Sequence, residues 1–137
     1  MRVDDGTSQV LRIIGDASLL DVRRVVDSHC KAIGFGLVDQ TRLITAASEL
    51  ARNIILYAHE GSVTIERLAT SNRLGLKMVF EDHGPGIADL GQAMRDGYTT
   101  GRGMGLGLPG TRRLVHEFAI DSIVGRGTRV SIVQWKR

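Results

Sequence analysis

Several features that would assign a function class are scarce or missing in this sequence. A single cysteine excludes an internal disulfide, and Cys30, in the segment VVDSHCKAI, is expected to pack at a half-buried helix position. No apolar run approaches the roughly 20 residues of a membrane span, and the start MRVDDGTSQV lacks the basic and apolar regions of a signal peptide. We therefore expect a cytoplasmic protein without membrane contact.

Nucleic-acid binding is also disfavoured by what the sequence lacks. Aromatic residues make up only 4% of the chain, too few for a stacking platform on single strands. The 18 basic residues are spread among 15 acidic ones, which leaves a formal charge of +3. We expect no nucleic-acid partner, because a nucleotide or an acidic protein partner explains this small excess equally well.

Glycine, in contrast, is abundant, with 17 residues in 137. Five of them fall within GRGMGLGLPG at 101–110, at the start of a helix-like segment. Glycine costs folding entropy, a cost that is tolerated where the backbone turns sharply or approaches a ligand closely. A helix N-terminus offers free N–H groups to phosphate, although such a stretch can also be only a flexible linker. It is neither a Walker loop nor a dinucleotide fingerprint, because no GK[ST] follows and no first strand and crossover helix flank it.

The hydrophobic pattern predicts one domain over residues 1–137. The predicted strands are 10–14, 63–69, 74–82, 119–125 and 128–135. The predicted helices are 19–34, capped by Asp16 or Ser18 and ended by Gly34 or Gly36; 40–58, capped by Asp39; a short helix within 88–97; and 108–118. HEGS at 59–62 is expected to be a break. Five residues of the second helix recur at helical spacing and should face the core: Leu43, Ala47, Leu50, Ile54 and Tyr57.

The order of these elements favours an α+β fold. One strand, two helices, a hairpin, a loop with a short helix, a further helix and a second hairpin predict one mixed, mostly antiparallel sheet. TSNR at 70–73 and GRG at 125–127 suit the two hairpin turns. We expect two layers, with the helices covering one face of the sheet.

Two of four short stretches that could carry chemistry contain carboxylates. In SELARN, Glu49 and Asn53 are four residues apart on a predicted helix, so their side chains emerge on one face and could share a metal or ligand. The alternative is a solvent-facing Glu49 paired with Arg52. In EDHGPG, Asp82 at a strand end could accept a hydrogen bond from an amino group, beside glycine backbone that a ligand can approach. The alternative is a capped turn.

The other two stretches are rich in glycine. One is the segment at 101–110 described above. The other is GRGT at 125–128, which by itself is most simply a hairpin turn.

In this order and at these intervals, the four stretches resemble the nucleotide-binding boxes of the ATPase and kinase superfamily that includes gyrase, Hsp90, histidine kinases and MutL. Glu49 and Asn53 match the helix box, and DHGPG matches the Asp-x-Gly-x-Gly box. GMGLG at 103–107 and GRGT match the glycine-rich and closing boxes. The resemblance implies a Bergerat ATP-binding fold, a two-layer α/β sandwich, with ATP and Mg²⁺ as ligands.

The resemblance also implies a role for individual residues. Glu49 would be the catalytic base, and Asn53 would coordinate magnesium. Asp82 would bind the adenine amino group, Thr128 would support the adenine pocket, and residues 87–102 would form a lid over the ATP. The remaining positions expected to contact the nucleotide are Gly84, Gly86, Ile87, Gly103, Gly105, Leu106, Gly107 and Leu108.

Within the superfamily, the wording is similar to that of the RsbT-type switch kinases of the stressosome over essentially the whole chain. GLGLPGTRRLVHEF and VGRGT follow the RsbT pattern, whereas anti-sigma factors usually have E-A-x-x-N and a glycine box followed by Phe-Leu-Ile. Gyrase, Hsp90 and MutL carry further domains, and the chain ends six residues after Ser131, so we do not expect these. Nor do we expect a histidine kinase, because no histidine lies in an upstream dimerising helix pair. The four histidines are expected to be solvated surface or loop residues: His29, His59, His83 and His116.

The resemblance implies an ATP-dependent serine/threonine protein kinase with STAS-domain stressosome proteins as substrates. Once released by phosphorylation, the kinase would activate an output protein, commonly a PP2C-type phosphatase. Two alternatives stay open. One is an anti-sigma factor kinase that binds a sigma factor and phosphorylates its antagonist. The other is a nucleotide-binding regulatory module without transferase activity, against which the intact Glu49 argues.

Overall fold

The computed structural model describes residues 3–95 and 107–137. In chain order, the elements of these residues are β1 (Val3–Ile14), α1 (Asp16–Ile33), α2 (Leu37–Tyr57), β2 (Glu60–Ala69), β3 (Leu74–Asp82), α3 (Leu90–Ala93), α4 (Leu108–Leu114), β4 (Glu117–Ile123) and β5 (Gly127–Trp135).

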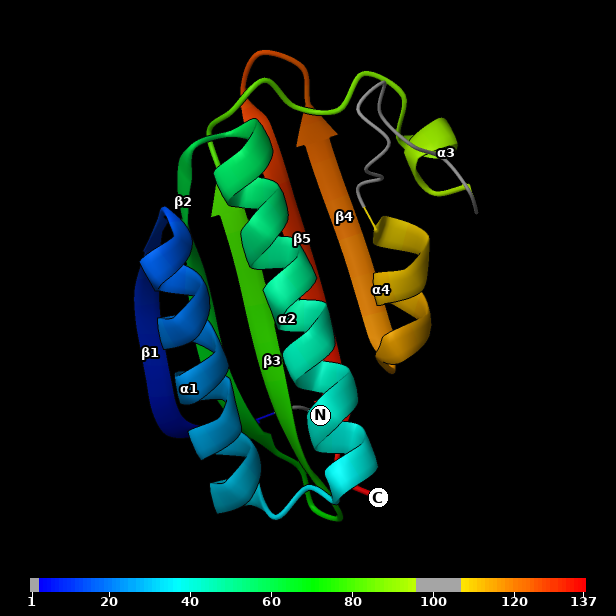
Figure 1. Ribbon diagram of the computed structural model, residues 1–137. Coiled ribbons are helices and arrows are strands. Elements are labelled where there is room, and N and C mark those ends of the chain that lie inside the picture. The colour runs from blue at the N-terminus through cyan, green and yellow to red at the C-terminus, as the bar shows by residue number, and fades with distance from the viewer. Residues whose placement is uncertain (1–2, 96–106) are drawn as a thin grey trace.

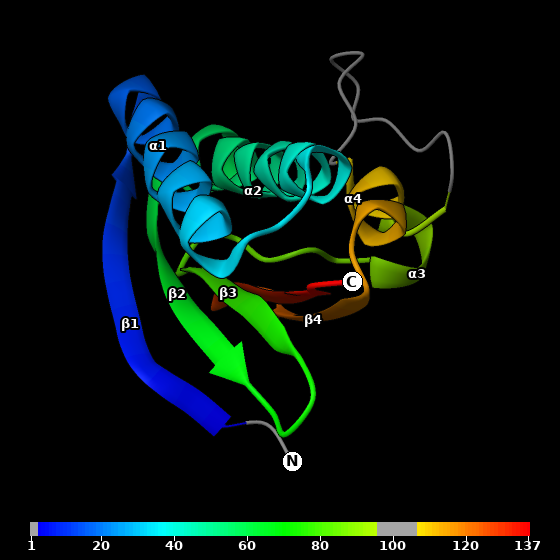
Figure 2. The same ribbon diagram turned by 90° about the horizontal axis from the view of Figure 1, so that it is seen from below.

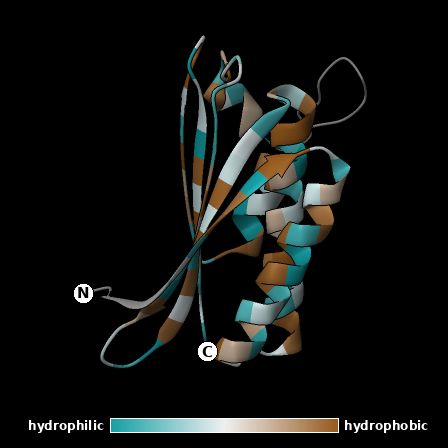
Figure 3. Ribbon diagram, turned by 90° about the vertical axis from the view of Figure 1, so that its left-hand side faces the viewer, coloured by the Kyte–Doolittle hydropathy of each residue, from teal (hydrophilic) through white to brown (hydrophobic). Residues whose placement is uncertain are grey.

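The five described strands form one sheet in the order β1-β2-β3-β5-β4, and their four pairings are all antiparallel. α1, α2 and α4 lie on one face of this sheet, as Figure 1 and Figure 2 show. Figure 3 shows the two layers from the side. The predicted α+β fold in two layers, with helices on one face, is confirmed. The prediction of a mixed sheet is wrong for the described strands, because every neighbouring pair runs in opposite directions.

The hydrophobic core lies between the sheet and the helices. Four of the five predicted core residues of α2 are buried: Leu43, Ala47, Leu50 and Ile54. Tyr57, the fifth, is half-buried at the end of the helix. Cys30 is completely buried in the core, which raises the pKa of its thiol to about 12, with a smaller contribution from nearby Asp27. Its predicted role as a packing residue is confirmed, at a deeper position than expected.

The predicted side-chain cap of the first helix is wrong. α1 begins after Gly15, and Asp16 and Ser18 both lie within its first turn. Ser18 Oγ accepts a hydrogen bond from Ile14 N at 2.9 Å, so the hydroxyl ties the helix to the end of β1. The predicted end at Gly34 is confirmed, with this glycine in the left-handed conformation at φ 90°.

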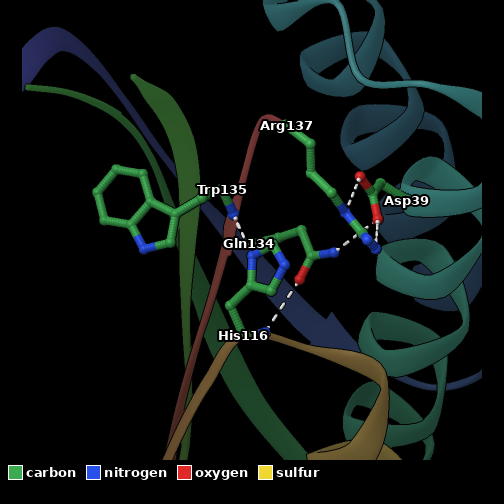
Figure 4. Close-up of polar contacts among 5 residues, drawn as sticks. All are labelled: Asp39, His116, Gln134, Trp135 and Arg137. Carbon is green, nitrogen blue, oxygen red and sulfur yellow. Dashed lines mark hydrogen bonds and ion pairs between the residues drawn. The ribbon is translucent and has the colours of Figure 1, made fainter. Parts of the chain in front are cut away.

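The predicted cap of the second helix is also wrong, for a tertiary reason. α2 begins after Gly36, and Asp39 lies in its first turn. Asp39 Oδ1 accepts hydrogen bonds from Gln134 Nε2 at 3.1 Å and Arg137 Nη2 at 2.8 Å, and its Oδ2 accepts one from Arg137 Nε at 3.1 Å (Figure 4). The Arg137 guanidinium holds the pKa of the Asp39 carboxyl below its usual range. The carboxylate therefore joins α2 to the end of β5.

Three boundaries differ from prediction because strand pairing extends further than the hydrophobic pattern. β1 begins at Val3, within a polar segment whose backbone pairs with β2. β2 begins at Glu60, inside the segment predicted as a break. α4 ends at Leu114, and the last residues of the predicted helix instead start β4. There His116 Nδ1 accepts a hydrogen bond from Trp135 N at 2.9 Å, a contact that strand pairing makes possible and a longer helix would not.

Three of the four histidines have the predicted exposure and one does not. His59, His83 and His116 are exposed as expected, but His29 is 4% exposed and its Nδ1 accepts a hydrogen bond from Arg67 Nε at 2.9 Å. The surface position predicted for His29 is wrong, because α1 turns this residue toward β2. None of the helices described by the structure has the length and apolar character needed to cross a membrane.

Candidate functional site

A cavity of about 300 Å³ lies between α2, α4 and the sheet, near the end of β3. This volume is at the lower end of the range for small-molecule sites, which typically have apolar walls and a few polar groups. The side chains and backbone that line it are Leu50, Asn53, Ile54, Tyr57, Ala58, Phe80, Asp82, Pro85, Gly86, Ile87, Ala88, Asp89, Gln92, Leu108, Ile120, Thr128 and Val130.

Strand register places a row of polar residues at one end of the sheet. Asp82 of β3 lies opposite Thr128 of β5, which lies opposite Ser122 of β4. Opposite residues in neighbouring strands share a face, and Phe80, two residues before Asp82, is a core residue. The row therefore faces the helix layer, and two of its members line the cavity directly.

The loop after β3 is held by hydrogen bonds and contains a glycine that no larger residue could replace without strain. Gly84 N donates to Asp82 Oδ1 at 2.9 Å, which is the capped turn considered above. Gly86 has φ 76°, and a Cβ on it would lie 2.5 Å from Ile123 O, so another residue would be strained and crowded there. Ile87 N donates to Ser122 Oγ at 2.7 Å. The turn and the cavity wall are thus the same structure rather than alternatives.

Asn53 and Glu49 emerge from the same face of α2 but have different surroundings. Asn53 lines the cavity, whereas Glu49 lies one turn earlier and outside the lining residues. Glu49 Oε2 is 3.2 Å from Arg52 Nη1, the ion pair considered as an alternative. A Cβ on Gly107 would lie 2.7 Å from Glu49 Cγ, so the carboxylate packs against the backbone at the start of α4. Gly107 has φ 67°, a backbone conformation that residues with a side chain rarely adopt.

The structure brings together most of the predicted site residues that it describes. Six line the cavity: Asn53, Asp82, Gly86, Ile87, Leu108 and Thr128. Gly84, Gly107 and Glu49 lie beside it through the contacts described above. Gly103, Gly105 and Leu106 lie outside the described residues, as does part of the segment predicted as a lid.

Sequence reasoning missed Ser122 and most of the apolar walls. Tyr57 was assigned to the core, but it lines the cavity together with Phe80, Ile120 and Val130. The signal for these residues is alternation, since β-strand residues two apart share a face. Ser122 follows Ile120 by two positions, but its contact with Thr128 depends on the register of the hairpin.

The donor set fits the ATP and Mg²⁺ that the resemblance implies. Among the residues described, no three His, Cys, Asp or Glu side chains gather to hold a metal by themselves. Mg²⁺ commonly takes few protein ligands and completes its coordination with phosphate oxygens and water, so an oxygen ligand such as the amide of Asn53, which lines the cavity, fits this ion. The apolar walls suit a planar base, and the Asp82 carboxylate suits an amino group.

Comparisons with known proteins agree with this geometry. The sequence pattern of the family described as histidine kinase-, DNA gyrase B-, and HSP90-like ATPase matches residues 38–137. The chain is 45% identical over 127 residues to the serine/threonine-protein kinase RsbT of Bacillus subtilis (strain 168), covering 93% of this chain and 96% of that protein.

Solved structures agree on the fold. Two nucleotide-free forms of the catalytic domain of the histidine kinase ThkA match with TM-scores of 0.54 and 0.53, at 14% and 16% identity. Each match covers 93% of this chain and 96% of the other, and at such identities it supports the fold alone. The chain therefore belongs to the family of histidine kinase-, DNA gyrase B- and HSP90-like ATPases and, within it, to the RsbT serine/threonine-protein kinases.

Proposed function

We propose that residues 1–137 form a single kinase domain that binds Mg²⁺–ATP in the cavity and transfers the γ-phosphoryl group to serine or threonine of a partner protein. Membership of an ATPase family implies ATP binding. The observation that carries the proposal is the convergence of three separate sequence stretches on one cavity, through Asn53, Asp82 and Thr128.

The adenine end of the site is the row at the end of the sheet. Asp82 is half-buried, and its carboxylate is a hydrogen-bond acceptor that suits the amino group of adenine. The base would lie between the apolar side chains contributed by α2 and the sheet, since these exclude water on both sides. Leu108 at the start of α4 and Ile87 complete this wall.

The phosphate end of the site lies toward Asn53 and Glu49. Bound Mg²⁺ would offset the negative charge of the phosphates during transfer. Asn53 would hold this ion, and the glycine-rich backbone would surround the phosphates. Glu49 would accept the proton of the serine hydroxyl while the serine oxygen attacks the γ-phosphorus. The bond between the γ-phosphorus and the oxygen that bridges it to the β-phosphate then breaks, and ADP leaves. Arg52 would keep the Glu49 carboxylate oriented through their ion pair.

The partners proposed are those that RsbT-type kinases imply. The substrates would be STAS-domain scaffold proteins of the stressosome, and the released kinase would activate a PP2C-type phosphatase or another output protein in the cytoplasm. The 45% identity to RsbT over nearly the whole of both chains supports this choice over the anti-sigma factor kinase.

The proposal is tested with radiolabelled ATP and purified STAS-domain proteins as substrates. Glu49→Gln should lower the rate of phosphate transfer by roughly 10²- to 10⁴-fold, because the amide cannot accept the proton. ATP binding, measured by calorimetry, should be retained. The matched control is Glu66→Gln on β2, whose neighbour Ile65 faces the core, so that Glu66 lies on the opposite face of the sheet. This control should transfer phosphate at the parental rate.

The possible outcomes distinguish the alternatives. A Glu49→Gln variant that phosphorylates its partner at the parental rate overturns the assignment of the base. ATP binding without any phosphoprotein product indicates a regulatory module instead of a kinase. Phosphorylation of a sigma-factor antagonist, together with co-purification of RNA polymerase subunits, indicates an anti-sigma factor kinase.

A further inference from the structure

The hydroxyl group of Ser122 occupies a junction between two of the nucleotide-binding stretches. It is half-buried on β4 and contacts three polar groups. Ser122 Oγ accepts a hydrogen bond from Ile87 N at 2.7 Å, donates to Gly127 O at 3.2 Å and lies 2.8 Å from Thr128 Oγ1. The first partner belongs to the loop after Asp82 and the other two to the closing box. One side chain therefore joins both stretches beside the cavity.

By distance alone either hydroxyl could be the donor in the contact between Ser122 and Thr128, and counting protons shows which direction satisfies all three contacts. A serine hydroxyl has one proton and two lone pairs. The bond from Ile87 N uses one lone pair, and the bond to Gly127 O uses the proton. All three contacts are hydrogen bonds only if Thr128 donates its own proton to the remaining lone pair of Ser122. If Ser122 donated to Thr128 instead, the contact with Gly127 would have no proton.

This direction determines what Thr128 offers to a ligand. With all three contacts of Ser122 satisfied, the Thr128 proton points to Ser122, so only lone pairs remain for the cavity that Thr128 lines. Asp82 lies opposite Thr128 in the neighbouring strand and, as a carboxylate, also only accepts hydrogen bonds. The end of the cavity thus presents two neighbouring acceptors, which match the two N–H groups of an exocyclic amino group.

We propose that Ser122 is a specificity-determining residue: it orients the Thr128 hydroxyl as an acceptor and so helps to select a purine base that carries an amino group. This inference rests on the proposed nucleotide site and goes beyond it, since Ser122 acts through Thr128 without touching the nucleotide. It predicts that removing Ser122 changes which base is preferred.

The test measures what the amino group contributes to binding. ADP and purine riboside 5′-diphosphate, which lacks the amino group, are titrated calorimetrically into the full chain. In Ser122→Ala the Thr128 proton is free to point into the cavity, so the preference for ADP over the analogue should fall roughly 3- to 10-fold, the effect of one hydrogen bond. Ser122→Thr keeps the hydroxyl and should retain the preference.

Two further variants keep the result interpretable. Ser131→Ala removes a serine of β5 that lies between core residues Val130 and Ile132 and so faces away from the helices, and it should leave the preference unchanged. Thr128→Val removes the acceptor itself and should lower the preference for ADP by a similar factor. This variant tests the inference independently if Ser122→Ala does not fold. In a double variant the two losses should not add.

The outcomes separate this inference from the proposed function. A kinase assay should give a raised KM for ATP and an unchanged kcat in Ser122→Ala, because the phosphate end is untouched. If Ser122→Ala or Thr128→Val binds ADP and the analogue with the parental ratio, Ser122 does not set specificity and the inference is wrong. If the parental chain binds neither nucleotide, the proposed function itself fails.

Discussion

An aspartate lies at each end of the sheet, Asp39 on α2 and Asp82 on β3, and the two carboxylates have very different surroundings. At one end, Asp39 is 8% exposed and accepts hydrogen bonds from Gln134 and from two nitrogens of Arg137 (Figure 4). At the other end, Asp82 is half-buried, accepts one bond from Gly84 N and lines the cavity.

The difference separates a structural carboxylate from one that can bind a ligand. Both oxygens of Asp39 already accept hydrogen bonds from donors within the protein, and these bonds join α2 to β5. The carboxylate therefore has little capacity to accept a hydrogen bond from a ligand. Asp82 has acceptor capacity that faces an apolar cavity, where one hydrogen bond to a ligand is worth more than in water. Removing Asp39 should therefore change stability, whereas removing Asp82 should change binding.

Of the effects that distinguish the two aspartates, the largest is expected on nucleotide affinity. Asp82→Asn should weaken ADP binding roughly 30- to 100-fold, because a hydrogen bond to a charged acceptor becomes a neutral one or is lost. The free energy of unfolding should hardly change. Calorimetric titration and urea unfolding measure the two quantities. Asp121→Asn, at an exposed position on β4, is the control and should alter neither. Unchanged ADP affinity in Asp82→Asn would contradict the position of the adenine pocket.

A smaller effect, on stability, is expected at the other end. Asp39→Ala should lower the free energy of unfolding by about 2 kcal/mol, because Gln134 is 0% exposed and its amide loses an acceptor. ADP affinity should be retained. Asp16→Ala is matched, since it removes an acidic residue from the first turn of α1 without disturbing this network. If both variants lose equal stability, the effect comes from helix-terminus charge and the network contributes nothing.

The smallest effect is a dependence on pH. Arg137 lowers the pKa of the folded Asp39 carboxyl. The stabilisation is therefore complete above the unfolded pKa of about 4 and is lost as the pH falls through the lower folded pKa. The difference in unfolding free energy between the parental chain and Asp39→Ala should shrink as the pH is lowered from 7 to 3. A difference that stays constant over this range would exclude the carboxylate charge as its source.

The sequence predicted features that depend on local pattern. Leu43, Leu50 and Ile54 repeat at helical spacing, and burial of one helix face follows from that spacing alone. The hairpin of β2 and β3 has a polar turn between two apolar runs. The prediction that Asn53, Asp82 and Thr128 lie together came from the resemblance to a family, since no local sequence rule brings these residues together.

The features it missed depend on partners far along the chain. Asp39 satisfies the composition rule for a helix cap, but Arg137, which binds it, is 98 residues away. The helix expected through His116 gives way to a strand because β5 offers hydrogen bonds to this segment. Ser122 has no distinctive neighbours in sequence, and only its register opposite Thr128 gives it a role.

Hydrogen–deuterium exchange with and without ADP tests the central claim most directly, because it reports both ends of the sheet at once. The account predicts slower amide exchange on adding ADP at 82–87 and 122–128, where the cavity is lined, and no change at 37–39 and 133–137. Protection at the Asp39 end, or none at 82–87, would show that the nucleotide does not bind in this cavity.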